Sequence, residues 1–200
     1  MKQAALLAAA AVVLAACDGI PRATYSMVSE HMLPTLEKGD IIGGDRWKGE
    51  CGKTRPEPGQ IVFFRRQGVI YAARVIAGPG QTVAMKAGRL TIDGQPVKTE
   101  LAGVYDITLP GGDVASQSVF RETLANGASY RTLDFGPDGM LDTVQPTRVE
   151  GGWFVLGDSR DNAADSRLHG AVPQADLCAV ATAVIFAKDK TRVGQPLSDR

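Results

Sequence analysis

The stretch Ser29-Glu30-His31-Met32-Leu33-Pro34-Thr35-Leu36 decides the fold, together with the stretch Gly157-Asp158-Ser159-Arg160-Asp161-Asn162-Ala163-Ala164-Asp165-Ser166-Arg167. We call these two stretches the first box and the last box. Ser29 and His31 are two residues apart, so their side chains point to the same face wherever the backbone is extended. All charged residues of the last box are aspartates or arginines. A folded site that uses both boxes requires the intervening chain to bring them together.

The composition is that of an ordinary globular protein. The chain has 200 residues, of which 44% are hydrophobic and 22% charged, and its formal net charge is +0. A neutral chain gives no electrostatic reason to expect a nucleic-acid partner. The 23 glycines and 11 prolines favour short strands and turns over long helices.

Short β-branched and aromatic runs predict a mainly β fold. We expect strands over 41–42, 60–64, 69–76, 153–156 and 179–186, and further strand pieces at 120–124 and 129–133. Residues 83–97 are predicted to form a hairpin closed by an Asp93-Gly94 turn. The more polar stretch 99–149 is expected to be an inserted second lobe, and helix-period patterns are almost absent.

The N-terminus has the pattern of a bacterial lipoprotein leader. Lys2 precedes an unbroken apolar run, Ala4 to Ala16, which is too short to span a bilayer as a helix. The run ends in Leu14-Ala15-Ala16-Cys17, similar to a lipobox, so we expect removal of residues 1–16, acylation of Cys17 and a tether over 17–27. An ordinary secretory signal with an incidental cysteine is the alternative. Asp18 resembles an inner-membrane retention signal, which places the expected protein on the periplasmic face of the inner membrane, with the bilayer as a partner.

Two cysteines remain if Cys17 is acylated. Cys51 and Cys178 would lie in an oxidising compartment, where disulfides persist. Sequence leaves two interpretations open: a disulfide between them, or two unrelated thiols with Cys178 buried next to the strand at 179–186.

Four segments in order resemble the bacterial signal peptidase I family: 29–40, 58–64, 71–81 and 157–173. The resemblance implies a two-lobed β fold, with a core formed by 28–98 and 150–187, an inserted β lobe over 99–149 and a C-terminal tail over 188–200. In this family the first box reads Ser-x-Ser-Met-x-Pro-Thr-Leu.

The resemblance assigns catalytic positions that this chain does not fill. The nucleophile position is His31, the position of the general-base lysine is Ala73, and that of the serine orienting the lysine is Ala163. Only the oxyanion-binding serine is present, as Ser29. The positions that frame the family's site are retained: Pro34, Asp40, Arg74, Gly157, Asp158, Arg160, Asp165 and Arg167.

We therefore expect a family member without the Ser-Lys reaction that keeps a groove for extended or signal-peptide-like segments, or for a secretion-related partner. One alternative is an active endopeptidase with a rearranged Ser29-His31 dyad, and another is a scaffold component of a secretion system. No cofactor and no metal is expected, because the only two histidines, His31 and His169, have no metal-ligand spacing.

Overall fold

The structure, a computed structural model, describes residues 23–46, 50–108, 111–136 and 139–197. The predicted leader, the tether up to residue 22 and the acylation of Cys17 lie outside the described residues. Among the described residues, no helix has the length and apolar character needed to cross a membrane.

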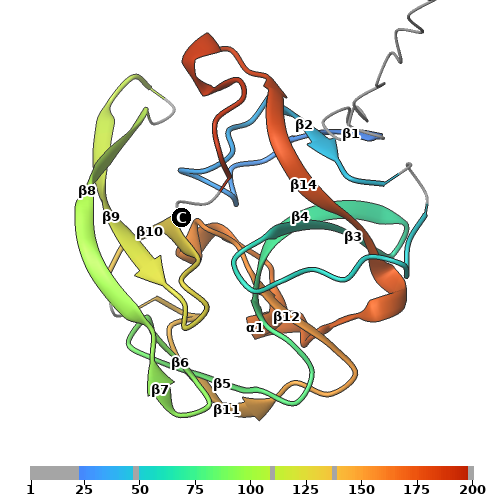
Figure 1. Cartoon of the computed structure of the whole chain (residues 1–200). Helices are drawn as coiled ribbons and strands as arrows, with labels where there is room; N and C mark the ends of the chain where they lie inside the picture. Colours follow the sequence, from blue (N-terminus) through green and yellow to red (C-terminus); the bar gives the residue numbers. More distant parts are fainter. Residues whose placement is uncertain (1–22, 47–49, 109–110, 137–138, 198–200) are drawn as a thin grey trace, which may run out of the picture.

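The largest sheet has seven strands, in the order β1-β2-β14-β3-β4-β12-β13, with antiparallel pairing throughout (Figure 1). Its strands are β1 (Ala23–Ser26), β2 (Ile41–Gly44), β3 (Ile61–Arg66), β4 (Val69–Ala77), β12 (Gly152–Leu156), β13 (Val172–Pro173) and β14 (Leu177–Phe186).

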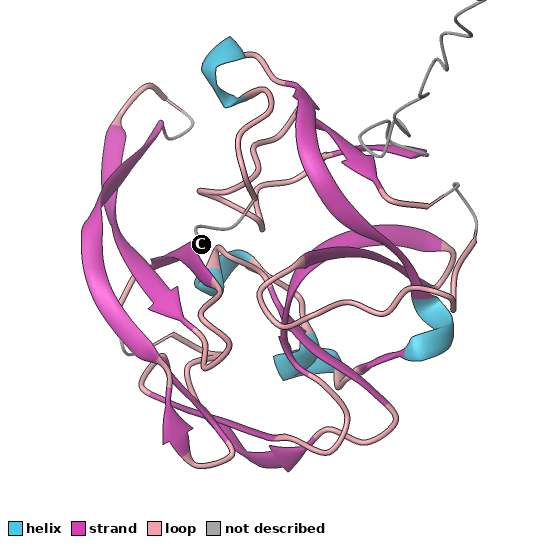
Figure 2. Ribbon diagram, viewed as in Figure 1, coloured by secondary structure: helices cyan, strands magenta, loops and turns pink. Residues whose placement is uncertain are grey.

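Two smaller sheets complete the fold. One has the order β10-β9-β8, from β8 (Lys98–Thr108), β9 (Val114–Thr123) and β10 (Ser129–Asp134). The other has the order β11-β5-β6-β7, from β5 (Thr82–Lys86), β6 (Arg89–Ile92), β7 (Gln95–Pro96) and β11 (Val144–Arg148). Helices in the described residues are single turns: η1 (Arg160–Asn162), α1 (Ser166–His169), η2 (Gln174–Asp176) and η3 (Lys190–Arg192), drawn in cyan in Figure 2.

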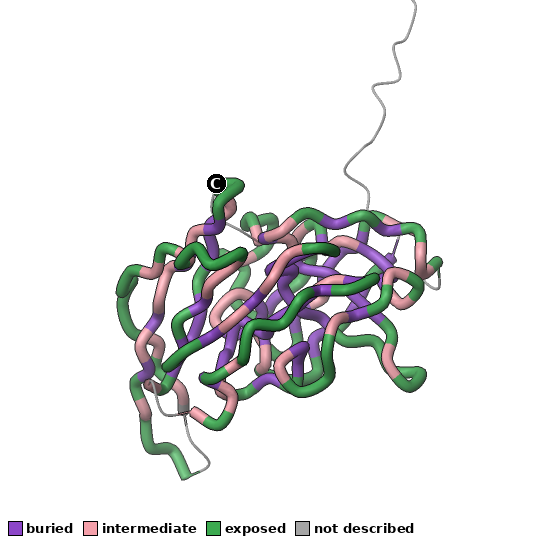
Figure 3. Tube along the Cα trace, turned by 90° about the horizontal axis from the view of Figure 1, so that it is seen from below, coloured by how far each residue is buried: buried purple, intermediate pink, exposed green. Residues whose placement is uncertain are grey.

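The run Ile61-Val62-Phe63-Phe64 shows why the large sheet is stable. All four side chains are buried, although successive residues of a strand point to opposite faces. Ile61 and Phe63 enter one hydrophobic cluster, where Phe63 stacks on Tyr25, while Val62 and Phe64 enter another on the opposite face. Both faces of β3 are thus covered. In Figure 3 the buried stretches, in purple, lie mostly in the interior of the molecule.

The prediction of a mainly β fold is confirmed, but three local expectations differ from the structure. Residues 23–26, assigned to the tether, form strand β1 and pair with β2. Residues 83–92 are two strands and not one, because Ala87 and Gly88 both adopt positive φ and close a tight turn between them. The predicted Asp93-Gly94 turn does join β6 to β7.

The third difference concerns the second lobe. Strand β11 comes from the stretch 99–149 but pairs with β5, which lies before that stretch. The lobe therefore takes strands from both sides of the predicted boundary at residue 98.

Cys51 and Cys178 form a disulfide in the structure, at a sequence separation of 127. The bond ties the loop before β3 to the start of strand β14. Of the two interpretations that the sequence left open, the structure contains the paired one.

Candidate active site

The two boxes meet at their backbones. The Ser159 amide donates a hydrogen bond to the His31 carbonyl over 3.1 Å. Gly157 permits this approach, because a Cβ atom there would lie 2.7 Å from the His31 carbonyl oxygen and would collide with the Ala163 side chain. A side chain at 157 would thus separate the boxes.

A groove of about 230 Å³ lies between the boxes and strand β4. The structure brings together the four positions that the resemblance singled out, since Ser29, His31, Ala73 and Ala163 all line it. The remaining lining residues are Glu30, Phe64, Tyr71, Ala72, Gly157, Asn162, Ala164 and Asp165.

The His31 ring contacts two other groups that line this groove. Its Nδ1 lies 2.6 Å from Ser29 Oγ, and its Nε2 lies 2.8 Å from the Ala72 carbonyl oxygen. A carbonyl only accepts, so Nε2 carries the proton and Nδ1 accepts the Ser29 hydroxyl. Burial lowers the pKa of His31, against the opposing effects of the Ala72 carbonyl, Asp158 and Asp165. The neutral imidazole is therefore favoured near pH 7.

Among the described residues, no strand pairs with one edge of β4 along this groove. β12 pairs with β4 only at Ala77, Val75 and Arg74, so residues 69–73 have no β12 partner. Val75 exchanges hydrogen bonds with the β3 side, through Gln60 and Gly59. By the alternation of strand backbone, Ala72 presents its N–H and C=O to the open side. His31 Nε2 donates its hydrogen bond to this Ala72 carbonyl.

The frame positions form a buried ionic network beneath the groove. Arg74 and Asp158 are fully buried and joined by two contacts, Nε to Oδ1 at 2.7 Å and Nη2 to Oδ2 at 2.6 Å. Thr35 donates to the same carboxylate over 2.6 Å. Arg74 therefore links the first box, β4 and the last box at one point.

The other frame residues hold the boxes themselves. Arg167 pairs with Asp165, which also accepts the Gly157 amide over 3.0 Å. The Asp40 carboxylate accepts a hydrogen bond from the Glu37 amide over 2.8 Å, just after the end of the first box. Within the box, the peptide bond between Leu33 and Pro34 is cis.

A second buried pair was not predicted in the sequence analysis. Arg160 of the last box holds Glu122 of β9 through two contacts of 2.6 Å, and the Tyr130 hydroxyl donates to the same carboxylate over 2.9 Å. Burial acts to lower the pKa of Arg160, but the Glu122 carboxylate overcomes it and the pKa is raised. Burial and then Glu122 raise the pKa of Tyr130. The sequence signal was an acidic residue, Glu122, within a strand-forming stretch of the insertion.

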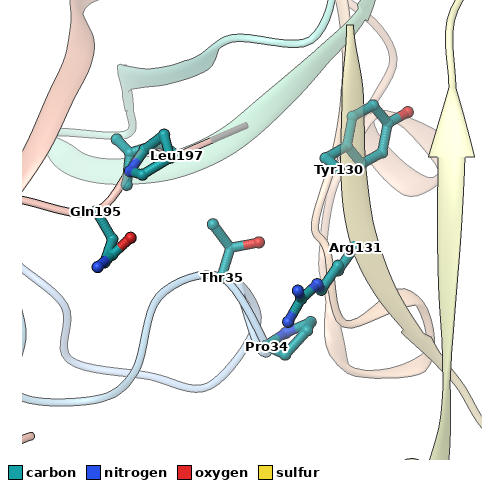
Figure 4. Close-up of a pocket in the computed structure, with 7 residues that line it drawn as sticks. Pro34, Thr35, Tyr130, Arg131, Gln195 and Leu197 are labelled. Carbon is teal, nitrogen blue, oxygen red and sulfur yellow. The ribbon is translucent and has the colours of Figure 1, made fainter. Parts of the chain in front are cut away.

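The C-terminal segment, expected to be a tail, packs against the first box. Arg192 contacts Asp40 and donates to the Thr35 carbonyl over 2.9 Å, and the Leu197 carbonyl accepts from Arg74 over 3.0 Å. A separate pocket of about 230 Å³ lies between this segment, Thr35 and β10 (Figure 4). It shares no lining residue with the groove.

His169 does not belong to the groove. It lines a different pocket, beside the β3–β4 turn, and its carbonyl accepts from Arg66 over 3.1 Å. The structure does not bring His31 and His169 to a common pocket.

The sequence is similar to known proteins over most of its length. Residues 1–186 match the family described as "Signal peptidase, peptidase S26". Signal peptidase I of Rickettsia prowazekii is 32% identical over 152 residues, which are 70% of this chain and 56% of the relative. "Probable signal peptidase I-1" of Synechocystis is 29% identical over 159 residues, 74% of this chain and 63% of the relative.

A crystal structure of a signal peptidase I from Enterococcus faecalis is 26% identical, covers 64% of this chain and 98% of its own, and has a TM-score of 0.37. The chain spans little more than half the length of the Rickettsia relative. With the family description matched across both boxes and all the strands between them, the chain belongs to the signal peptidase family, peptidase S26.

Proposed function

We propose that this chain binds extended peptide segments by strand addition along residues 69–73 of β4 and does not cut them by a Ser-Lys reaction. The observation that carries the proposal is the open edge of β4 in the wall of the groove. A peptide there would exchange main-chain hydrogen bonds with Ala72 and Ile70. The groove has a volume of about 230 Å³, which suits small side chains.

The groove lacks the groups that the Ser-Lys reaction requires. The side chains at the base and orienting positions are buried methyl groups, of Ala73 and Ala163, and neither can take or hold a proton. His31 occupies the nucleophile position, and its ring is engaged on both nitrogens. Without a nucleophile and base that act together, only oxyanion stabilisation and binding remain, and their residual catalysis is small.

The segments that suit this groove are those rich in small residues, as in signal peptides, or the extended part of a secretion-related protein. We further propose that Cys17 carries acyl chains that anchor the chain on the periplasmic face of the inner membrane. The apolar run before Cys17, and Asp18 after it, support this placement. An anchored groove would meet peptides as they emerge from the bilayer.

One observation favours a second candidate, hydrolysis by a Ser29-His31 dyad. Ser29 Oγ is 2.6 Å from Nδ1 of a ring whose other nitrogen is held by the Ala72 carbonyl, the arrangement of nucleophile, base and orienting group. Ser29 Oγ would attack the scissile carbonyl while its proton passes to Nδ1. That proton would then reach the leaving amine, and water would release the acyl group by the same route.

The test uses the purified full chain in detergent and a fluorescent peptide with alanine at alternate positions, followed by anisotropy for binding and by mass spectrometry for cleavage. We expect binding without product. Ala72→Pro removes the N–H on the open side but not the pairing with β3, so binding should be lost while the thermal midpoint changes little.

His31→Ala supplies the matched comparison. It frees the Ala72 carbonyl, and one additional hydrogen bond should strengthen peptide binding by about 2- to 10-fold. Product that disappears in Ser29→Ala would establish the dyad instead. Product only in the triple variant His31→Ser, Ala73→Lys, Ala163→Ser would show an intact groove without a catalyst. Absence of binding in all of these proteins would leave the scaffold role.

A further inference from the structure

The C-terminal segment, residues 188–197, has a defined conformation and is fixed at several points. Asp189 caps η3, because its Oδ1 accepts from the Thr191 amide over 2.9 Å and from the Thr191 hydroxyl over 2.8 Å. The Gly194 amide donates to a carbonyl of β14 over 2.9 Å, and Leu197 packs against a hydrophobic cluster of the large sheet. The segment therefore forms a fixed part of the fold.

Arg192 joins this segment to the end of the first box. Its Nη1 and Nη2 lie 2.9 Å and 2.8 Å from the two carboxylate oxygens of Asp40, and Nη2 also donates to the Thr35 carbonyl over 2.9 Å. A forked guanidinium fixes both the position and the orientation of the groups that it holds. Asp40 is buried, so loss of Arg192 would leave its carboxylate with the Glu37 amide as its donor.

Asp40 is tied in turn to the chain just before the first box. The Met27 amide donates to the Asp40 carbonyl over 2.9 Å, and the Gly39 amide donates to the Met27 carbonyl over 2.8 Å. These two bonds close a loop over 27–40, which we call the first-box loop. Ser29 and His31 lie two and four residues after Met27. Arg192 therefore holds the closed end of the loop that carries both groove residues.

The segment makes a second contact, with the buried Arg74. A guanidinium has five N–H donors, and the five hydrogen bonds of Arg74 go to both oxygens of Asp158, the Thr35 hydroxyl, the Gly59 carbonyl and the Leu197 carbonyl. The Leu197 carbonyl accepts over 3.0 Å. Without it, a fully buried N–H would lose its acceptor, which carries a desolvation cost.

No residue of the C-terminal segment lines the groove. Gln195, Pro196 and Leu197 line instead the separate pocket of Figure 4, together with Thr35. Any effect of the segment on the groove must therefore pass through the first-box loop or through Arg74.

We infer that the C-terminal segment positions the groove, with Arg192 as the positioning residue for the first-box loop and the Leu197 carbonyl as the contact to Arg74. The loop is held at the groove by the bond from the Ser159 amide to the His31 carbonyl, and at its closed end by Arg192. Release of the closed end would loosen the His31 ring and expose it. The effect on peptide binding rests on the proposed function, whereas the effect on His31 does not.

The test follows the histidine rings of the full chain in detergent by proton NMR during a pH titration. His31 and His169 are the only two histidines, and His169, in another pocket, is the internal reference. Burial lowers the pKa of His31 below 6.5, against the opposing effects of the Ala72 carbonyl, Asp158 and Asp165. Because burial is the largest of these effects, the pKa of His31 should rise toward 6.5 in Arg192→Met, while the His169 signal should titrate as before.

Two further variants separate positioning from charge and from stability. Lys188→Met removes an exposed cation of the same segment and should leave the His31 curve in place. Arg192→Lys keeps the charge, but an ammonium cannot reproduce the fork, so the His31 curve should move in the same direction and by less. An unchanged His31 curve in folded Arg192→Met, even with a lower urea midpoint, would overturn the inference. If Arg192→Met does not fold, an unchanged His31 curve in Arg192→Lys has the same meaning.

Peptide affinity is compared in the His31→Ala background, where the Ala72 carbonyl is already free. Adding Arg192→Met should weaken binding about fivefold if the groove is correctly arranged only about one-fifth of the time, and adding Lys188→Met should not change it. Equal affinities of these two double variants would overturn an effect on the groove. If even the unmodified chain binds no peptide, the proposed function fails, while a moved His31 curve still supports the positioning role.

Discussion

Asp158→Asn should be among the most destabilising isosteric changes in this chain. The amide keeps one acceptor but removes the charge, and it turns a donor toward Arg74 Nη2 or Thr35 Oγ1, both of which lie 2.6 Å from Oδ2 in the native protein. Arg74 is fully buried and would keep its charge without a counterion. Breaking a buried pair in this way costs about 3–5 kcal/mol. That is a large fraction of a typical domain stability of about 5–15 kcal/mol.

Urea denaturation followed by tryptophan fluorescence measures this cost. With an m-value of about 2 kcal/mol/M, the midpoint should fall by about 1.5–2.5 M. Glu100→Gln is the control, because Glu100 pairs with Lys98 at the surface, where both side chains are more than half exposed. Its cost should stay below about 1 kcal/mol.

A double-mutant cycle with Arg74→Met sharpens the same prediction. Arg74 also donates to the Gly59 and Leu197 carbonyls, so Arg74→Met has a cost of its own that Asp158→Asn does not share. The shared part is the ion pair, and we expect a coupling energy of about 2 kcal/mol or more. A cost below 1 kcal/mol for Asp158→Asn, or a coupling near zero, would refute the idea that this pair joins the two boxes.

Three further changes have defined outcomes. The folded-state pKa of His31 is lowered, so its contribution to stability is present above its unfolded pKa of about 6.5 and is lost as the pH falls through the folded value. The unfolding free energy of His31→Gln should therefore depend less on pH between 7.5 and 5 than that of the unmodified chain. The double variant Cys51→Ala, Cys178→Ala should lose about 2–5 kcal/mol of unfolding free energy, since the disulfide closes a long loop. A reductant should lower the stability of the unmodified chain and have little effect on that of the double variant. Gly157→Ala should cost about 1–3 kcal/mol through overpacking against Ala163 and should weaken peptide binding in the anisotropy assay; unchanged binding would argue against contact between the boxes as the basis of the groove.

The strands that sequence predicted well are those whose burial is visible locally. β3 and β12 are short, nearly continuous apolar runs, because both of their faces are covered. β1 was not predicted, since four residues alternating between buried and exposed carry little signal next to an apolar leader. Its partner β2 begins 15 residues after the end of β1, so tertiary pairing decides the conformation of β1.

The same distinction applies to the site. The family's motifs were enough to single out Ser29, His31, Ala73 and Ala163, and all four line one groove in the structure. The role of the Ala72 carbonyl as the acceptor for His31 could not be predicted, because every residue type has a backbone carbonyl and its direction depends on strand register. Glu122 was missed for a similar reason, since its partner Arg160 lies in η1, 38 residues further along the chain.

The geometry also explains why the three changed positions belong together. A serine at 31 alone would have no base, because position 73 offers only a methyl group. A lysine at 73 alone would face an imidazole that already holds the Ala72 carbonyl and the Ser29 hydroxyl. An orienting serine at 163 would have no amine to orient. Groups that act as one catalytic unit lose nearly all activity with the first member, so single restorations should gain almost nothing. The Arg74–Asp158 and Arg160–Glu122 pairs do not depend on these positions, and they preserve the groove whether or not chemistry takes place in it.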